Sequence, residues 1–419
     1  MGASKASIMK RITFSVSKSF ASFWPCPLIL STLWFLMLDT TSSVSFAGTP
    51  KEVVSTRLVF FIAGFCLASW APLVPLIKER AGLDEGILGI LLLGLGIGSI
   101  IAMPVAGALV SRWGCRRIIL AGTFVLLGML PLLATLSKLE LLLPALIVFG
   151  VGMGSLDCAM NVQAVEVNAQ SSKPIMSSFH GLFSLGGIMG ALTMTALLKL
   201  SVTPLHAVLI VDGLSLLVLY RSSAGLLTIG ERKRAPLFAI PKGEVLFLGA
   251  LCFIVFLAEG AMLDWSGLYL ITQQNLQTEL SGLAYATFAT AMTVGRLLGD
   301  RIVAQVGRKL VVGLGGAIAA LGLVISLATT EWMVSLMGYS LIGLGCANIV
   351  PVLFSAVADQ KSMPKAVAIP AMTTVGYAGV LVGPAFIGFI AHASSLGVSL
   401  AVVAIGLLLV AMSGRFVRA

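Results

Sequence analysis

The chain has 419 residues, of which 58% are hydrophobic and only 11% are charged, and its mean hydropathy is +1.05. A water-soluble core could not bury that much apolar surface, so the composition excludes an ordinary soluble domain. The formal charge of +10 is spread over short segments between apolar runs, and this pattern excludes the basic stripe or tail expected of a nucleic-acid-binding protein.

The first fifty residues form a separate extension. They combine a basic start with a short apolar run at 28–38 and a Ser45-Phe46-Ala47 sequence that resembles a signal-peptidase site. Cleavage there would leave the new N-terminus outside and place the basic loops that follow on the wrong face. We therefore expect residues 1–50 to be an interfacial extension, or the result of a start codon assigned too far upstream with Met37 as a candidate true start. A signal peptide is the alternative.

After this extension, apolar stretches recur to the end of the chain. Because a bilayer core requires about 20 apolar residues per helix, each stretch is long enough to cross it. We predict twelve spans, at 57–77, 87–110, 118–136, 141–165, 176–200, 205–221, 244–272, 281–300, 309–329, 331–357, 366–390 and 396–414. The polar segment 222–243 is the natural linker between an N-terminal six-helix bundle at 51–221 and a C-terminal six-helix bundle at 244–419. The fold class is therefore an all-α membrane protein.

Basic residues are distributed unevenly between the two ends of these spans. If the region before Leu58 is cytoplasmic, eighteen Lys and Arg residues lie on the cytoplasmic side and four lie opposite. Because basic residues near span ends stay inside, this asymmetry predicts an inner-membrane protein with both termini and the linker in the cytoplasm.

Two connecting loops in matching positions share a pattern of glycine and arginine. Each follows the second span of its half, and together they contain Gly107, Arg112, Gly114, Arg116, Arg117, Asp300, Arg301, Gly307 and Arg308. The glycines permit tight turns, and the arginines can bind the carbonyls at helix C-termini. The matched positions indicate an internal repeat about an axis along the membrane normal, although ordinary positively charged turns would explain either loop alone.

These loops resemble the cytoplasmic signature of the major facilitator superfamily, GxxxD(R/K)xGR(R/K), and the match is partial. Ser111 and Ala304 stand where the family has an aspartate, and Cys115 replaces an arginine. Asp300 takes the place of the leading glycine in the second copy. The carboxylate that normally helps to latch the two halves is thus missing from its usual place, and Asp300 with Arg296 at i, i+4 could do related work.

A second resemblance is more specific. The segments 157–163, 174–186, 258–265 and 292–296 look like the YbjJ-type branch, which is similar to the fucose permeases. The likeness runs from about Ser69 to Pro384. It implies the fold of two pseudo-symmetric six-helix bundles and solute transport, but this branch does not by itself identify a substrate. A sugar or related polar metabolite is one candidate cargo. Sugar–proton members carry an acid in the first span and residues 58–77 contain none, so proton-coupled sugar uptake does not follow from the likeness.

Carboxylates inside a spanning segment are costly and persist mainly where they face a partner or a wet cavity. Four residues meet this description: Asp157, Asp212, Glu259 and Asp264. The spacing of Asp157 and Asn161 places both on one face of span four, where with Gln163 they could form the wall of a solute site. Asp157 and Glu259 could take up and release a proton as the cavity opens to each side, and a permanent hydrogen bond or ion pair is the alternative. Asp212 is expected to be structural.

Three further side chains are weaker candidates. His180 could bind solute or titrate, and packing beside the cytoplasmic loop is the favoured interpretation. Trp70 and Trp265 could stack on a ring of the solute, although aromatic residues near span ends are more often interface anchors. Arg296 is expected to extend to the cytoplasmic surface or to pair with Asp300, so it is left out of the binding set.

Backbone breakers are expected to bend two spans. Asn348 and Pro351 interrupt span ten, while Gly376, Gly379, Gly383 and Pro384 loosen span eleven. Close helix packing is the alternative explanation of those glycines.

The sequence predicts a secondary transporter that works by alternating access. It contains no GxxxxGK(S/T) nucleotide loop and no nucleophile, base and orienting group at recognisable spacing, so neither an enzyme nor a cofactor or metal site is expected. The expected partners are a small-molecule solute, protons and the lipid bilayer, with no nucleic acid, and the chain is expected to be a monomer. Efflux of hydrophobic or cationic compounds is one alternative. A non-transporting membrane receptor is another.

Overall fold

The computed structural model describes residues 50–417 except 84, 229–239, 278–279 and 281. The chain divides into Met1–Phe46, which lies outside the described residues, and Ala47–Ala419, to which all of the following refers. The predictions for the N-terminal extension and for most of the linker therefore fall outside the described residues.

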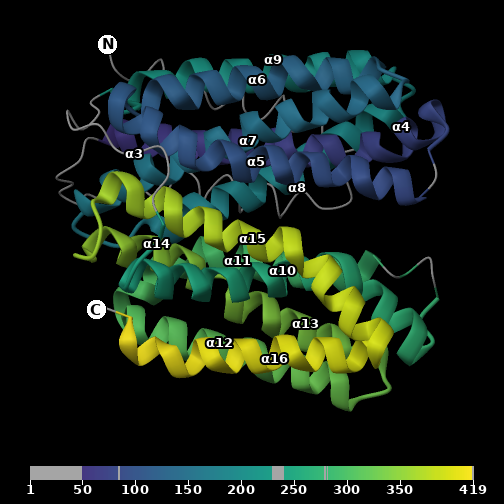
Figure 1. Ribbon diagram of the computed structural model, residues 1–419, viewed down its shortest axis with the longest axis vertical. Helices are drawn as coiled ribbons and strands as arrows, with labels where there is room; N and C mark the ends of the chain where they lie inside the picture. Colours follow the sequence, from purple (N-terminus) through teal and green to yellow (C-terminus); the bar gives the residue numbers. More distant parts are fainter. Residues whose placement is uncertain (1–49, 84, 229–239, 278–279, 281, 418–419) are drawn as a thin grey trace, which may run out of the picture. The chain divides into compact units, whose positions relative to one another are not determined.

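The first half of the chain supplies six spans (Figure 1). They are α3 (Pro50–Trp70) continuing through η2 (Ala71–Leu73) into α4 (Val74–Ala81), then α5 (Glu85–Trp113), α6 (Cys115–Thr135), α7 (Leu139–Ala169), α8 (Met176–Lys199) and α9 (Pro204–Ser222), which ends in η3 (Ser223–Gly225). The first span is longer than predicted, and it changes from α3 to α4 where Pro72 and Pro75 remove backbone donors.

The second half supplies the remaining spans. They are α10 (Glu244–Gln274), α11 (Gly282–Val306), α12 (Arg308–Ala328), α13 (Trp332–Cys346) with α14 (Ile349–Asp359), α15 (Lys365–Ala393) and α16 (Leu396–Ser413), which ends in η5 (Gly414–Phe416). The described residues contain helices and no strand, so the all-α prediction is confirmed.

Eleven of the twelve predicted spans are long and apolar enough to cross a membrane, counted over the described residues. The exception is α11, which is 25 residues long but carries Arg296, Asp300 and Arg301. These charges lower its mean hydropathy, and two of them, Arg296 and Asp300, contact other helices of the bundle as described below. A helix held inside a bundle need not be apolar all round.

The two halves repeat the same local geometry. Gly114 (φ 80°, ψ 163°) and Gly307 (φ 83°, ψ 158°) both separate the second and third helices of their halves. Each lies in a backbone region that favours glycine. Further along the same helices, a Cβ on Gly122 would lie 2.9 Å from the carbonyl oxygen of Gly152, and one on Gly315 would lie 2.6 Å from that of Gly345. These matched contacts confirm the pseudo-symmetric arrangement.

Span ten is broken as predicted. α13 ends at Cys346, α14 begins at Ile349, and the side chain of Asn348 between them donates a hydrogen bond to the carbonyl of Gly295 at 3.0 Å. Span eleven is a continuous helix instead, α15. A Cβ on Gly376 would lie 3.0 Å from the Cys252 sulfur, so this glycine allows α15 to pack closely against α10.

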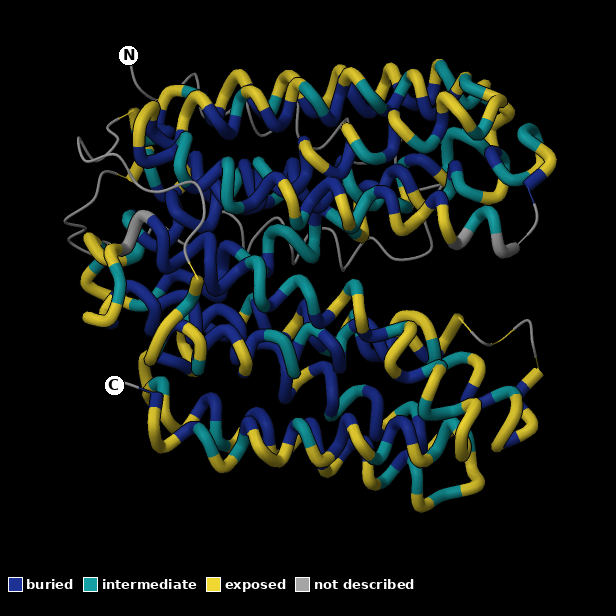
Figure 2. The backbone as a smooth tube through the Cα atoms, viewed as in Figure 1, coloured by how far each residue is buried: buried dark blue, intermediate teal, exposed yellow. Residues whose placement is uncertain are grey.

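The halves contact one another mainly at the end of the bundle where α3 begins and α16 ends, which we call the terminal end. There α8 packs on α11 and α5 packs on α15. Residues 367–373 of α15 are buried at this end, whereas Val380, Val382 and Phe389 further along the helix are exposed. Figure 2 shows the buried segments gathered between the halves at the terminal end. The bundle interface is therefore closed at one end and more exposed at the other.

Candidate functional site

A buried ion pair lies where the two halves meet. The guanidinium Nη2 of Arg296 in α11 is 3.1 Å from Oε1 of Glu259 in α10, and the two side chains are 8% and 21% exposed. The expectation that Arg296 extends to the surface or pairs with Asp300 was wrong. A long cationic side chain in the bundle is stabilised by the nearest buried carboxylate, which the fold brings from another helix, because neither charge could be buried alone.

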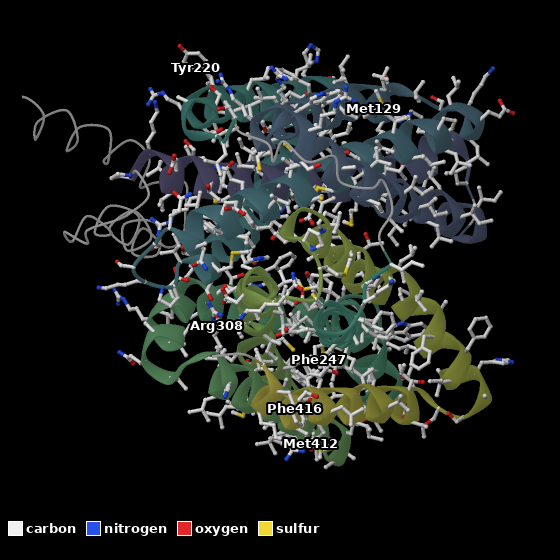
Figure 3. The ribbon with its side chains drawn as sticks, turned by 60° about the vertical axis from the view of Figure 1, so that its left-hand side comes forward. Met129, Tyr220, Phe247, Arg308, Met412 and Phe416 are labelled. Carbon is white, nitrogen blue, oxygen red and sulfur yellow. The ribbon has the colours of Figure 1, made fainter. Side chains whose placement is uncertain are left out.

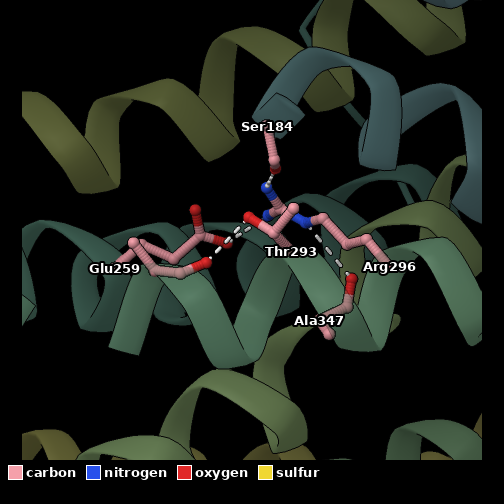
Figure 4. A network of polar contacts seen from close by, with 6 residues as sticks. Ser184, Glu259, Thr293, Arg296 and Ala347 are labelled. Atoms are coloured by element: carbon pink, nitrogen blue, oxygen red, sulfur yellow. Dashed lines mark hydrogen bonds and ion pairs between the residues drawn. The ribbon is translucent and has the colours of Figure 1, made fainter. Parts of the chain in front are cut away.

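Arg296 also connects the halves (Figure 4). Its Nη1 donates to Oγ of Ser184 in α8 at 2.8 Å, and its Nε donates to the carbonyl oxygen of Ala347 at 3.4 Å. That carbonyl follows the last residue of α13, where helix C-terminal carbonyls lack their usual partners and attract positive charge. One side chain thus joins α8 of the first half to α10 and the broken span of the second.

A second polar group lies on α7. Asp157 and Asn161 are 4% and 1% exposed, and Nδ2 of Asn161 donates to the Asp157 backbone carbonyl at 2.9 Å. The carboxylate of Asp157 interacts with the hydroxyl of Tyr377 in α15, which packs edge-on against Phe256 with ring centroids 5.3 Å apart. Within the described residues, Oδ2 of Asp157 and Oδ1 of Asn161 are buried without a hydrogen-bond partner. Two such acceptors are what a bound polar molecule or an ordered water would satisfy.

The two polar groups are electrostatic neighbours. Tyr377 is close enough to interact with both Asp157 and Glu259, and His180 interacts with Arg296. The His180 ring packs against Phe60 of α3 and Phe354 of α14, with centroids 5.2 and 5.6 Å away, while its buried Nε2 has no hydrogen-bond partner in the described chain. Elements of both halves therefore bring two carboxyl groups, a guanidinium, an amide, a phenol and an imidazole together.

Asp300 forms a separate contact nearer the terminal end. Both of its carboxylate oxygens accept from the backbone N–H of Ser178 at 3.2 Å, in the first turn of α8 of the other half. A carboxylate at a helix N-terminus satisfies free N–H groups and is stabilised by the helix dipole. Arg57 of α3 interacts with Asp300 and donates to Oγ of Ser178 at 3.3 Å. Sequence reasoning missed this role of Arg57, which is one of the eighteen basic residues that indicate the orientation of the chain.

Gln163 lies away from this cluster, within the first half. Its Nε2 donates to Oγ1 of Thr56 and to the carbonyl of Gly225, each at 3.3 Å, and its Oε1 accepts from the N–H of Leu227 at 2.9 Å. Gln163 is fully buried and holds the chain that leaves α9 against α3 and α7. A residue two positions along a helix lies on nearly the opposite face, so Gln163 and Asn161 cannot line the same wall of a solute site.

The remaining intramembrane residues singled out from the sequence lie apart from one another. Trp70 is buried in the first half, with its ring 6.2 Å from that of Phe149. Asp264 of α10 is exposed, whereas the adjacent Trp265 is partly buried and its Nε1 lacks a partner among the described residues. Asp212 of α9 is 8% exposed and interacts electrostatically with the Cys66 thiol of α3, away from Arg296.

The loop residues have local roles. A Cβ on Gly107 of α5 would meet the ring of Pro370 in α15, so this glycine lies directly at the contact between halves. The Arg116 N–H donates to the Leu227 carbonyl at 2.9 Å, and Arg112 lies 5.8 Å above the Trp113 ring. Arg308 forms an ion pair with Asp359 at the end of α14. Arg117 and Arg301 are exposed.

The comparisons with known proteins agree with this architecture. The family model of the Major Facilitator Superfamily matches residues 56–384. The chain belongs to the major facilitator superfamily. It is 49% identical over 368 residues to an uncharacterized MFS-type transporter of Yersinia pestis, a match that covers 88% of this chain and 96% of the relative. It is 31% identical over 380 residues to the membrane protein MosC of Rhizobium meliloti, covering 88% and 91%.

Solved structures of this superfamily have the same fold. The human organic anion transporter MFSD10 (TETRAN) superposes with a TM-score of 0.71 at 16% identity, over 87% of this chain and 100% of the transporter. The transporter FucP in the outward conformation gives a TM-score of 0.71 at 15% identity, over 88% and 99%. The chain is thus a multi-pass membrane protein of a transporter family, as the resemblance of the loops implied.

Proposed function

We propose that this superfamily member is a secondary active transporter that carries a small polar solute across the inner membrane by alternating access. The observation that carries the proposal is the cluster around Asp157, Glu259 and Arg296, in which charged groups from both halves are buried at their contact. Transporters built from two repeats bind their cargo at such a contact, and ionisable groups buried in a membrane bundle mark the pathway.

A solute rich in hydrogen-bond donors fits this cluster best. Asp157 Oδ2 and Asn161 Oδ1 are unpartnered acceptors in the described structure, and their spacing places them on one face of α7. A hydroxyl-rich compound such as a sugar or related polar metabolite could donate to both and accept from the outer N–H groups of Arg296. Accumulation of such a labelled compound in cells would support uptake, and its exclusion would support efflux.

Proton coupling would act through Glu259 and Asp157. A proton on Glu259 removes the charge that holds the Arg296 guanidinium, so the contact between Arg296 and Ser184 of the other half is freed to change. A proton on Asp157 turns one of its acceptors into a donor toward Tyr377 or the solute. Each proton would thereby alter a contact that spans the two halves.

We also propose that both termini are cytoplasmic. The charge asymmetry supports this orientation, which makes the terminal end the cytoplasmic side. The state described here is then closed toward the cytoplasm, with Asp300 on the N-terminus of α8 as one of the contacts that close it. Labelling of single cysteines with a membrane-impermeant reagent at Lys138 and Lys361, which lie at opposite ends, tests the orientation. Labelling of position 361 from outside intact cells would overturn it.

Reconstitution into liposomes tests the transport proposal. The purified chain is assayed with a panel of labelled sugars, polyols and amino acids, with and without a pH gradient, and compared with Asp157→Asn and Glu259→Gln. Glu331→Gln is the matched control, because Glu331 is an exposed carboxylate before α13. We expect the first two substitutions to abolish the response to the pH gradient and the control to retain it. Unchanged coupling in both would contradict the proton role, and binding without flux would favour a receptor.

A further inference from the structure

A groove lies between α12 and α16 at the terminal end, away from the contact between the halves. It has a volume of ≈ 610 Å³ and is lined by Lys309, Leu310, Gly313, Ala411, Met412 and Arg415. That volume falls in the range of about 300–1,000 Å³ that ligand sites occupy. Figure 3 labels Met412 and Phe416 at this end of α16 and η5, and Arg308 at the start of α12.

Small residues create the groove. A Cβ on Gly316 would lie 2.6 Å from the Ala411 nitrogen, and one on Gly414 would lie 2.6 Å from the Gly313 nitrogen, so the two helices approach backbone to backbone. Between these contacts a Cβ on Gly313 would touch only the Ala411 carbonyl, at 3.5 Å. The missing side chain leaves a slot whose floor is the two backbones.

The walls of the groove are apolar and face outward. Leu310 and Met412 are 56% and 64% exposed, and the adjacent Phe416 is 62% exposed. In a chain that spans a membrane, exposed apolar side chains on outer helices contact lipid. Such walls favour an occupant with an apolar chain.

The rim of the groove is basic. Lys309 and Arg415 are both exposed, and among the described lining residues there is no carboxylate. The adjacent Arg308 is already paired with Asp359, so its charge is compensated. Arg415 lies 4.6 Å above the Phe416 ring, which orients its guanidinium beside the apolar wall. Two cations thus lie at the end of an apolar slot.

We propose that this groove binds an anionic phospholipid, with the phosphate headgroup between Lys309 and Arg415 and an acyl chain along Gly313 and Met412. Basic pockets between spans on the cytoplasmic side bind anionic headgroups, because that leaflet carries the negative lipids. The lysine supplies a compact charge, and the arginine can bind two phosphate oxygens at once. A bound lipid would hold the end of α16 against α12.

Native mass spectrometry of the purified full chain in mild detergent tests the site. Phosphatidylglycerol is added as the anionic lipid and phosphatidylcholine as the zwitterionic one, and bound lipids are counted. We expect phosphatidylglycerol to bind preferentially and Lys309→Ala with Arg415→Ala to weaken that binding about twenty-five-fold, from about fivefold per basic residue. Arg221→Ala is the matched control, because Arg221 is an exposed arginine in the last turn of α9, the sixth span of the first half.

Two further variants separate the headgroup from the acyl chain. Gly313→Leu fills the slot while both charges remain, and it should weaken binding as the double alanine variant does. Lys309→Arg with Arg415→Lys keeps the charges and should retain binding, which also covers the case in which the alanine variant does not fold. Equal binding of the two lipids, or wild-type binding by the folded Gly313→Leu and double alanine variants, would overturn the proposal. Displacement of the lipid by inorganic phosphate would show a simple anion site and would also overturn it.

Discussion

The ion pair between Glu259 and Arg296 provides the most direct test of the packing between the halves. Both charges are almost fully enclosed, with 8% and 21% of the side chains exposed, so solvent screens them weakly. Removing one partner of a buried pair leaves the other charge uncompensated and costs about 3–5 kcal/mol. Glu259→Gln leaves an unpaired guanidinium and Arg296→Met leaves an unpaired carboxyl group. We expect each single change to lower the stability of the bundle by an amount near that range.

The double variant distinguishes this explanation from a general loss of packing. With both charges gone, neither is left buried alone, and an apolar replacement of a buried pair is often close to neutral. The double variant should therefore lose much less stability than about 6–10 kcal/mol, the sum of the two single losses. Unfolding of the purified chain in mixed micelles by increasing sodium dodecyl sulfate measures all four proteins. Additive losses would refute the proposed coupling.

Three further substitutions probe other parts of the structure. Asp300→Asn removes the negative charge that accepts a hydrogen bond from the Ser178 N–H at the N-terminus of α8. It should raise the accessibility of the terminal end to cysteine reagents, and unchanged labelling would contradict a closing role. Gln163→Leu should destabilise the first half by about 1–3 kcal/mol, because the Gly225 carbonyl and the Leu227 N–H lose their hydrogen bonds to this side chain. Stability equal to the wild type would show that water replaces those hydrogen bonds. Gly307→Ala should cost about 1–3 kcal/mol by strain alone, because φ 83° with ψ 158° is essentially restricted to glycine while its Cβ would have free space. Gly213→Ala in ordinary helix geometry carries no such strain, and equal melting temperatures would refute the strain argument.

Most of the fold was predictable from the sequence because a lipid bilayer permits few backbone conformations. A backbone in a bilayer must satisfy its own hydrogen bonds, so apolar stretches become helices wherever they are long enough. The glycines at 114 and 307 marked the repeat for the same kind of reason, since a turn with positive φ admits few other residues. The break in span ten was also predictable, because Asn348 and Pro351 are poor interior residues of a helix.

The site was less accessible to sequence reasoning because its contacts join distant segments. Arg296 was expected to extend to the cytoplasmic surface or to pair with Asp300 of its own helix, yet its partners come from α8, α10 and the end of α13. Helix periodicity grouped Asp157 with Asn161 correctly on one face, but it gave no warning that Gln163 is bound within the first half. Local spacing reports which residues share a helix face, whereas the helix that lies opposite depends on the tertiary fold.

The break in span ten also decides where the protein can be altered. All residues of α14 from Ile349 to Ala358 are buried, so this short helix has no side turned to lipid or water, unlike α16. Its neighbours include α7 and α8 of the first half and α10, α12 and α15 of the second. A larger side chain on α14 therefore has nowhere to go without displacing a helix. Fluorescent labels, crosslinkers and stabilising substitutions belong on α12 or α16, and a scan of all substitutions should find α14 the least tolerant segment of the bundle.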